Sequence, residues 1–420
     1  MLNLKKQKPL SKIIYFLFLL LILSGCWDQT KIDERAYVIA IGLDKGDNEN
    51  QIKITYLITN PELSKQEGGS SNEPPREIIT FQTNDLISAK DMANTVVAKE
   101  ITYSQLGVFL VSEELAKDKD LIRWMYDATK DREIKRSTRF IVTKENASDF
   151  LKENQPKLET RIHKYFELIL DDGIEKGYIP DSRLYGYFRI TEADADLYLA
   201  IYGTTERNNS GQNHGDEDQF LAGELITEGQ TNNTQFSGSA VFKEGKMVGK
   251  LNSEETRLST ILNESLNAED MLTTFPDPFN EKYRITTRIM KKSKNKVKMN
   301  LKNGTPTIDV TIPLYIEVLS NHSMVNYAKN KEKRDYLKKY LDDRITSKFN
   351  NVVKRTQEEF KGQPFGWSLI GRKEFLTIPE YDNFDWMKTY PSMKVNISVE
   401  IKFGEFGRQS ELPDLQEVRD

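Results

Sequence analysis

Leu23, Ser24, Gly25 and Cys26 form a short motif whose residue types and spacing point to a defined chemistry. An apolar residue, two small residues and a cysteine make up a bacterial lipobox, in which the cysteine thiol takes a lipid. The small residues are needed because a processing peptidase must close on extended backbone there. Cys26 is also the only cysteine of the chain. We therefore predict cleavage before Cys26 and acylation of its sulfur.

The segment before this motif has the layout of a signal peptide. Lys5, Lys6 and Lys8 form a basic start, and residues 13–23 form an apolar core. The core has only about half the ~20 residues that a helix needs to cross the hydrocarbon layer. It therefore indicates a segment that is removed rather than a membrane span. The alternative is an ordinary secretory signal followed by a chance cysteine.

A lipid on Cys26 would tether the whole chain to a membrane. Each buried methylene contributes ~0.8 kcal/mol; one acyl chain binds only reversibly, whereas two or three make a permanent anchor. Removal of residues 1–25 takes away four lysines and no acid, which lowers the formal net charge from −4 to −8. Nucleic acid and anionic lipid are unfavourable general partners for such a body. Acylation also leaves no thiol for a disulfide or a nucleophile.

Residues of the other types that catalyse reactions or bind metals give weaker signals. The three histidines, His163, His214 and His322, have no second histidine or cysteine at ligand spacing. The sequence has no phosphate-binding loop and no nucleophile elbow. The carboxylate pairs at 171–172 and 342–343 are interpreted as solvated helix faces. We therefore predict no enzyme activity, no catalytic residue, no metal and no cofactor other than the lipid on Cys26.

Two groups of side chains allow more than one interpretation. The first is a set of alternating lysines on one predicted strand: Lys292, Lys294, Lys296 and Lys298. They either contact lipid headgroups or an acidic partner, or they form an exposed face or edge that prevents unwanted strand pairing, which we favour. The second is the aromatic set Tyr185, Tyr187 and Phe188. It either lines a small-molecule pocket or, as we favour, packs in the core.

The first half of the chain alternates between predicted strands and helices. Residues 36–41 are an apolar run, and residues 51–58 alternate between apolar and polar, so the two predict a hairpin. Apolar spacing predicts helices over 85–99, 113–126 and 158–175, with short strands at 105–111 and 139–143. This alternation favours a mixed sheet with helices on a face.

The second half begins after a polar segment. Residues 208–219 contain no apolar side chain and many turn formers, which is typical of a linker or long loop. Beyond it we expect a hairpin over 236–250 and a helix capped by Ser253 with acids in its first turn. Three alternating segments in 283–318, a long amphipathic helix over 326–360 and a last strand at 395–403 follow.

The predicted fold class is α+β, with an elongated multi-domain body in which each domain is a mixed or antiparallel sheet packed with helices. The length of 420 residues leaves room for two or three domains after the signal peptide. The expected divisions are a lipoprotein signal peptide over 1–25, an N-terminal α+β domain over 26–205, a linker or long loop over 206–219, a middle α+β domain over 220–275, a C-terminal α+β domain with the long helix over 276–407, and a polar tail over 408–420.

Several blocks of the sequence resemble the Ger(x)C, or GerAC-like, family of lipoproteins, the C subunits of spore germinant receptors. The N-terminal blocks are Gly-Cys-Trp-Asp at 25–28, Ile-Asp-Glu-Arg-Ala at 32–36, Ala-Ile-Gly-Leu-Asp at 40–44 and Asn-Pro at 60–61. The central blocks are residues 238–242, 246–251 and 254–257, and the closing ones are Phe365-Gly366, Trp386 and Tyr390-Pro391. Around 362–367 the chain departs from the family pattern, which has an aspartate and a second Phe-Gly-like step. The resemblance is colinear over 26–407.

This resemblance implies a non-enzymatic subunit of a nutrient-germinant receptor. Members act with an integral-membrane A subunit and a transporter-like B subunit to trigger germination, and their fold is several α+β domains in a row. They are lipid-anchored on the outer face of the bacterial cytoplasmic membrane, which is the inner membrane of the spore. Cys26, as the acylation site, is the one position that takes a defined role from the family.

Two other classes of function, a solute-binding lipoprotein and a surface hydrolase, predict different sequence features. A solute-binding lipoprotein that captures a nutrient directly predicts two similar lobes around a cleft, and the sequence shows no duplicated lobe. A surface hydrolase predicts a catalytic motif, and the search for such motifs argues against it. A thermal-shift screen of the soluble body with amino acids and sugars separates the receptor subunit from the solute-binding protein.

Overall fold

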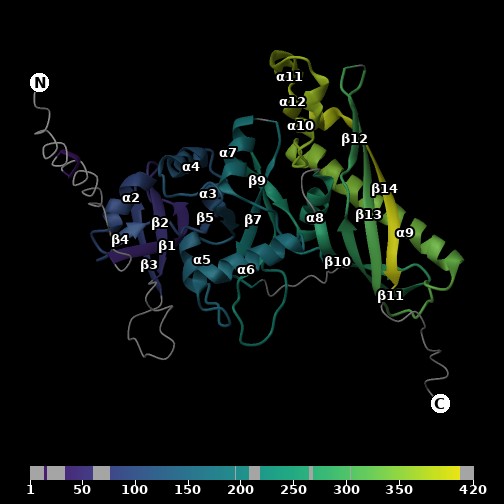
Figure 1. The fold of residues 1–420 in the computed structure, drawn as a ribbon, viewed down its shortest axis with the longest axis horizontal. Coiled ribbons are helices and arrows are strands. Elements are labelled where there is room, and N and C mark those ends of the chain that lie inside the picture. Colours follow the sequence, from purple (N-terminus) through teal and green to yellow (C-terminus); the bar gives the residue numbers. More distant parts are fainter. Residues whose placement is uncertain are drawn as a thin grey trace, which may run out of the picture.

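A computed structural model of the chain contains two twisted sheets that lie one after the other along an elongated molecule (Figure 1). The first sheet has nine strands and the second has five, and both are packed with helices. The α+β fold class expected from the sequence is therefore confirmed. The structure describes residues 14–16, 34–59, 76–193, 195–207, 218–263, 268–302 and 304–406.

The first sheet has a parallel centre with antiparallel strands on both sides. Its strands are β1 (Arg35–Lys45), β2 (Ile52–Thr59), β3 (Arg76–Thr83), β4 (Glu100–Thr102), β5 (Val108–Ser112), β6 (Arg139–Thr143), β7 (Tyr198–Thr204), β8 (Gln235–Lys243) and β9 (Lys246–Leu251). The order is β3-β2-β1-β5-β6-β7-β8-β9, with β4 also beside β1. β1, β5, β6 and β7 run parallel, and the pairs β1–β2, β2–β3, β7–β8 and β8–β9 are antiparallel.

Helices cover both faces of this sheet. They are α2 (Leu86–Ala93), α3 (Glu113–Ala116), α4 (Leu121–Lys130), α5 (Ala147–Glu153), α6 (Ile162–Glu175) and α7 (Leu184–Ala193). Buried side chains of α2, α3, α4 and α7 share one core, and those of α5 and α6 share another. The central strands are therefore apolar on both sides, and all five residues of β5 are buried.

The second sheet consists of β10 (Ala268–Asp277), β11 (Asn280–Lys291), β12 (Lys296–Asn300), β13 (Thr307–Asn321) and β14 (Lys394–Phe406). β12 and β11 pair with successive parts of β13, and β14 runs parallel to β13. Helix α9 (Lys331–Arg355) connects β13 to β14 and packs on one face of the sheet through Leu337, Leu341, Ile345 and Phe349. A π-helical turn, η3 (Thr356–Phe360), extends α9.

The remaining helices of this half lie between η3 and β14. They are α10 (Trp367–Gly371), α11 (Ile378–Phe384) and α12 (Trp386–Thr389), together with the 3-10 turns η4 (Arg372–Glu374) and η5 (Tyr390–Ser392). Their buried aromatic side chains, among them Trp367, Trp386 and Tyr390, belong to the same core as α9. Helix α8 (Ser253–Leu262) lies between the two sheets along the chain. Within the described part of the chain, no helix has the length and apolar character of a membrane span.

The first sheet continues beyond the linker at which we expected a domain to end. Strand β8, assigned from the sequence to a middle domain, pairs antiparallel with β7, and β9 pairs with β8. Polar composition identifies a long connection but carries no information about which sheet the next strand joins. Residues 208–217 of the expected linker, the signal peptide apart from residues 14–16, and the polar tail lie outside the described residues.

Two helices differ in detail from the sequence-based expectation. The long helix begins at Lys331 rather than near 326, because the Asn330 side chain accepts a hydrogen bond from the Lys333 N–H and caps it. Helix α8 is capped by Asn252 rather than Ser253. Asn252 and Glu255 form a reciprocal capping box in which each side chain accepts from the other's backbone N–H.

Candidate functional site at the junction of the two sheets

The motif with the clearest chemistry in the sequence lies outside the structure described above. Leu23, Ser24, Gly25 and Cys26 are not among the described residues, so acylation of Cys26 stays a prediction. The described body begins at Glu34 with β1 following at once. Any functional site in the described body consists of side chains that the fold brings together from separate segments.

The other sequence candidates for catalysis lie at separate surface positions. His163 on α6 and His322 after β13 are exposed, and His214 lies outside the described residues. Asp171 is bound by the Arg139 guanidinium at 2.6 Å, and Asp172 by the Lys176 ammonium at 2.7 Å. Across the described ranges, no three His, Cys, Asp or Glu side chains are grouped so that they could hold a metal ion.

The four lysines are at the surface, and the three aromatic residues lie in different environments. Lys292, Lys294, Lys296 and Lys298 are all exposed, and Lys296 pairs with Glu400 of β14 at 3.2 Å. Tyr187 is fully buried in the first core and donates to the Gly245 carbonyl at 2.8 Å. Tyr185 is exposed, whereas Phe188 lines a cavity between α4 and α7.

Carboxylates at the carboxyl ends of the parallel strands hold the fold together. Open α/β sheets commonly bind ligands at this edge. Here the buried Asp44, at the end of β1, accepts the Ala147 and Ser148 N–H groups at 2.6 and 3.0 Å. It thereby caps the N-terminus of α5, where the helix dipole favours a negative charge. Glu145, after β6, accepts the Thr205 N–H at 2.6 Å.

A second network at this edge surrounds Glu113, the first residue of α3. Its carboxylate accepts from the Tyr202 hydroxyl at 2.5 Å and pairs with Lys117 at 2.6 Å and Lys250 at 3.2 Å. Burial opposes ionisation of Glu113, but the hydrogen bonds from Lys117 and Tyr202 outweigh it and lower its pKa. Glu113, directly after β5, is therefore joined to β7 by the Tyr202 hydrogen bond and to β9 by the Lys250 ion pair.

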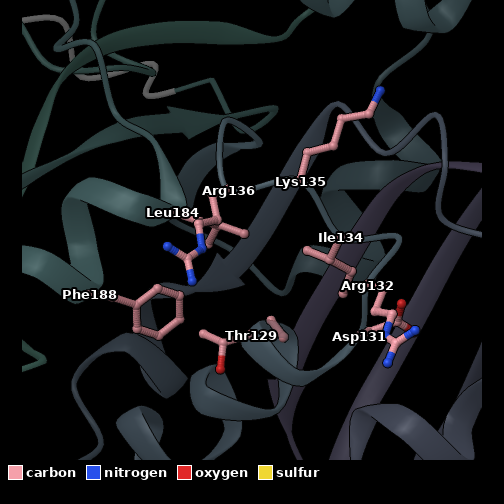
Figure 2. Close-up of a pocket in the computed structure, with 9 residues that line it drawn as sticks. Thr129, Asp131, Arg132, Ile134, Lys135, Arg136, Leu184 and Phe188 are labelled. Carbon is pink, nitrogen blue, oxygen red and sulfur yellow. The ribbon is translucent and has the colours of Figure 1, made fainter.

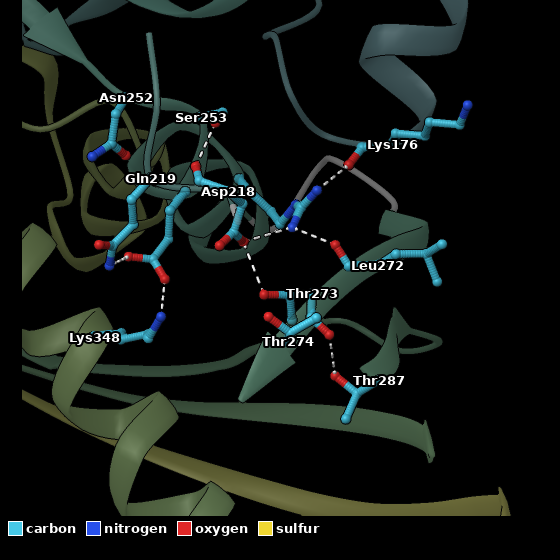
Figure 3. Close-up of polar contacts among 12 residues, drawn as sticks. Lys176, Asp218, Gln219, Asn252, Ser253, Leu272, Thr273, Thr274, Thr287 and Lys348 are labelled. Atoms are coloured by element: carbon cyan, nitrogen blue, oxygen red, sulfur yellow. Dashed lines mark hydrogen bonds and ion pairs between the residues drawn. The ribbon is translucent and has the colours of Figure 1, made fainter. Parts of the chain in front are cut away.

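Arg257, in the second turn of α8, joins three segments at the junction of the two sheets. Figure 3 shows its partners in these segments, Lys176, Asp218 and Leu272. Its Nη1 lies 2.8 Å from Asp218 Oδ2 and donates to the Leu272 carbonyl of β10 at 2.9 Å. Its Nη2 donates to the Lys176 carbonyl, after α6, at 3.0 Å. Its guanidinium carbon also lies 4.8 Å from the centre of the Tyr178 ring, within cation–π range. One side chain thus binds both sheet units.

The first turn of α8 is held by cations of α9. Glu255 pairs with the Arg355 guanidinium at 2.6 Å, and Glu254 pairs with Lys348. Gln219 donates a further hydrogen bond to Glu254 at 2.8 Å (Figure 3). Burial raises the pKa of Glu254, and the nearby Lys348 ammonium offsets only part of that effect.

The C-terminal end of α8 is held by the second sheet. The Lys291 ammonium donates to the Ile261 carbonyl at 3.0 Å and to the Asn263 carbonyl at 2.7 Å. Asn295 donates to the carbonyls of Ile261 and Leu262 at 2.9 and 3.1 Å. These are last-turn carbonyls that have no partner within a helix, and a cation there also complements the helix dipole. Lys291 and Asn295 flank the interruption between β11 and β12.

The opposite side of α8 packs on the first sheet. Thr256 and Ser239 of β8 are joined through their hydroxyls at 2.8 Å, both fully buried. Helix α8 is therefore fixed by buried polar contacts to β8 on one side and to β10, β11 and α9 on the other. Asp218 Oδ1, Arg257 Nε and Asn295 Oδ1 are buried without a hydrogen-bond partner among the described residues, so the network is only partly satisfied. Its remaining ion pairs and hydrogen bonds still tie both sheets to one helix. This α8 junction is suited to pass a displacement of one sheet to the other.

A cavity of ≈ 340 Å³ lies on the first sheet unit, between α4, α7 and the loop 131–138 (Figure 2). The apolar part of its wall comes from Ala128, Ile134, Leu184 and Phe188. Its charged part comes from one acid and three cations, namely Asp131, Arg132, Lys135 and Arg136. The cavity shares no residue with the α8 junction and has a different chemical character.

Sequence reasoning identified α8 and its first-turn acids but not the residues that bind them. Asp218 follows a polar segment, and nothing in the local pattern indicates its partner Arg257, 39 positions away. The sequence does contain one indication that Lys291 is buried and needs hydrogen-bond acceptors. Alternation along β11 places it on the same face as Ile285, Thr287 and Ile289, which are buried. An inward-facing lysine needs acceptors, because an isolated buried charge is costly.

Two family models match this chain. "Spore germination protein N-terminal domain" matches residues 28–203, and "Spore germination B3/GerAC like, C-terminal" matches residues 237–407. Among curated relatives, spore germination protein B3 of Bacillus subtilis (strain 168) is 22% identical over 420 residues, covering 96% of this chain and 100% of the relative. Spore germination protein GerQC of Bacillus cereus is 21% identical over 395 residues, covering 94% and 98% respectively.

The fold also resembles a solved structure. The crystal structure of the GerBC protein matches with a TM-score of 0.51 at 17% sequence identity, covering 86% of this chain and 96% of that chain. At this identity the match concerns the fold alone. The two family models together span most of the residues from the first strand to the last. The protein therefore belongs to the GerAC-like family of spore germination proteins.

Proposed function

We propose that this chain is the lipid-anchored C subunit of a spore nutrient-germinant receptor. In this proposal it is a non-enzymatic component that works with integral-membrane A and B subunits to trigger germination. The names of its relatives support a role in germination. The lipobox at residues 23–26 supports an anchor on the outer face of the cytoplasmic membrane, which becomes the inner membrane of the spore.

The observation that carries the proposed role is the α8 junction. Arg257 binds backbone carbonyls of both sheet units, and the cations Lys348 and Arg355 of α9 hold the first turn of α8. A body joined in this way moves as a unit, because a shear between the sheets would separate buried charges. Anchored through Cys26, it would stay at high local concentration beside its membrane partners, so that modest interfaces suffice.

Replacement of the acylated residue tests this proposal directly. In spores that carry Cys26→Ala, the protein should be absent from the inner-membrane fraction, because alanine offers no thiol for the lipid. Germination in response to the cognate nutrient should be lost or strongly slowed. Ser24→Ala is the matched control: it changes a neighbouring lipobox residue but keeps a small side chain, so anchoring and germination should be retained.

The proposal has a clear contrary outcome. If Cys26→Ala protein stays in the membrane fraction and the spores germinate normally, the lipid anchor has no role in the function. Mass spectrometry of the mature wild-type protein gives a second readout. Its first residue should be Cys26 carrying acyl chains, and an unmodified Cys26 would contradict the anchor irrespective of the germination result.

The alternative of direct nutrient capture is less compatible with the architecture. A two-lobed solute-binding protein would have two similar α/β lobes, whereas this body has a nine-stranded sheet with a parallel centre and a five-stranded, mainly antiparallel sheet. The two sheets are also clamped through α8. Saturable binding of amino acids or sugars in a thermal-shift screen would reverse this preference.

A further inference from the structure

The cavity between α4 and α7 is built on rigid elements. Glu133, in the loop 131–138, points inward: it pairs with Lys90 of α2 at 2.8 Å and accepts the Tyr103 N–H at 2.7 Å. The first turn of α7 is bound to the same loop, since the Leu184 N–H donates to the Thr138 carbonyl at 3.0 Å. The Tyr185 N–H likewise donates to the Arg136 carbonyl at 3.0 Å. The loop and α7 are therefore fixed relative to one another.

The inward position of Glu133 leaves an excess of positive charge on the outer side of the loop. Arg132, Lys135 and Arg136 are exposed and have no ion-pair partner among the described residues. Other cations nearby are neutralised, including Lys130 by Asp127 and Arg183 by Asp181.

One acid, Asp131, lies among three cations on the cavity wall, so it offsets only one of their three charges. Its carboxylate also accepts the Glu133 N–H at 2.8 Å. The local balance is therefore positive on a chain whose formal net charge is −4. A positive site on an acidic body concentrates anions locally.

The apolar wall lies close to the cations. Phe188 stacks on the exposed Tyr126 ring with 5.5 Å between centroids. Figure 2 shows the Arg136 guanidinium directed toward the Phe188 ring, Arg132 on the other side of the cavity, and Lys135 extending away from it. Ligand pockets combine apolar walls with a few charged groups in this manner, and ≈ 340 Å³ lies within their usual size range.

We propose that this cavity binds a phosphate group through Arg136, with the attached carbon skeleton packed against Phe188. A guanidinium offers paired N–H donors that match the geometry of phosphate oxygens, and it stays charged at every physiological pH. The group comes either from a soluble organic phosphate or from a phospholipid headgroup. The binding does not depend on the receptor role or on Cys26, so it is tested separately from them.

The test uses the chain from residue 27 onward, which keeps both sheets and every helix joined to them. Phenyl phosphate and inorganic phosphate are titrated by calorimetry at low salt, where exposed charges are least screened. In a second arm, the same protein is sedimented with phosphatidylcholine vesicles, with and without phosphatidylglycerol. Arg136→Gln is expected to weaken binding of the active probe at least about tenfold, because a hydrogen bond to a charged group is lost. Phe188→Leu should weaken the binding of phenyl phosphate more than the binding of inorganic phosphate.

Arg372→Gln is the matched control, since it removes one exposed guanidinium on the second sheet unit and changes the net charge equally. Phenyl phosphate binding that Arg136→Gln abolishes and Arg372→Gln spares supports a soluble ligand. Phosphatidylglycerol-dependent sedimentation with the same variant pattern supports a lipid headgroup. Absence of binding in both arms, or equal loss in the Arg136 and Arg372 variants, overturns the proposal.

Discussion

Asp218 Oδ2 lies 2.8 Å from Arg257 Nη1, and the two side chains are only 5% and 3% exposed. The pair does not stand alone, because Asp218 also accepts from the Thr273 hydroxyl at 3.0 Å and Arg257 donates to two backbone carbonyls. A buried ion pair adds little to stability compared with an apolar pair, but removal of one member leaves an uncompensated charge. Asp218 and Arg257 therefore determine how firmly the two sheets are joined.

Replacement of Arg257 should weaken that junction. In Arg257→Met the carboxylate of Asp218 stays buried without its counter-charge, and the expected loss in the free energy of unfolding is about 3–5 kcal/mol. Urea denaturation measures the loss, and hydrogen exchange should show faster exchange at the end of α6 and along β10. The double variant Arg257→Met/Asp218→Leu should recover part of the loss. If Arg257→Met is as stable as the surface variant Arg372→Gln, the Asp218–Arg257 pair does not stabilise the junction.

Replacement of Lys291 should release the C-terminal end of α8. Lys291→Met keeps a side chain of similar length but leaves the Ile261 and Asn263 carbonyls without this donor. The expected cost is about 1–3 kcal/mol, the usual range when a buried polar group loses its partner. Lys298→Met is the control, because Lys298 is exposed on β12, and its stability should equal that of the wild type. Equal midpoints for both variants in urea would contradict the capping role.

Asp196 should make the stability of the body depend on pH. Burial raises the pKa of Asp196 to about 6, and hydrogen bonds from Ser368, at 2.6 Å, and Gln363 only partly oppose this. Because the folded-state pKa exceeds the unfolded one, the folded protein binds this proton more tightly. The stabilisation is complete below about pH 4 and is lost as the pH rises through about 6.

The comparison with Asp196→Asn isolates this effect. The variant carries no titrating group there, so its stability relative to the wild type should rise by on the order of 2 kcal/mol between about pH 4 and pH 7. Asp382→Asn, at an exposed acid of α11, should show no such trend. Thermal denaturation across the pH range measures both differences. Parallel curves for wild type and Asp196→Asn would mean that the pKa of Asp196 is the same in the folded and the unfolded chain, and would contradict the raised pKa.

Local patterns predicted the elements whose determinants lie close together in the sequence. The hairpin of β8 and β9 was predicted from the turn residues Glu244, Gly245 and Lys246 between two strand-like stretches. In the structure the φ angles of Glu244 and Gly245 at this turn are positive, 52° and 79°. Strand β1 was identified from a continuous apolar run, and α9 from the recurrence of apolar residues at three- and four-residue spacing. The start of α9 was misplaced because residues 326–330 share the polar character of its first turn.

The candidate site itself was only partly predictable. The acids of α8 are visible in the sequence as a helix start, since Glu254 and Glu255 follow an N-cap residue. Their partners Lys348 and Arg355 lie about a hundred residues later, and charged helix residues of this kind are usually solvated. The cavity beside Phe188 was considered from its aromatic residues alone, and the cations of loop 131–138 were not linked to it.

The sequence by itself determined the lipobox prediction at Cys26, the family, the α+β class and most individual strands and helices, because each depends on short-range spacing or on a local motif. Only the tertiary structure decided that β8 extends the first sheet, that Asp218 meets Arg257, and that Lys291 caps α8. Strand pairing and buried ion pairs bring together segments whose separation in the chain carries no periodic signal. They form where two apolar faces can be buried at once and where each buried charge finds its counterpart.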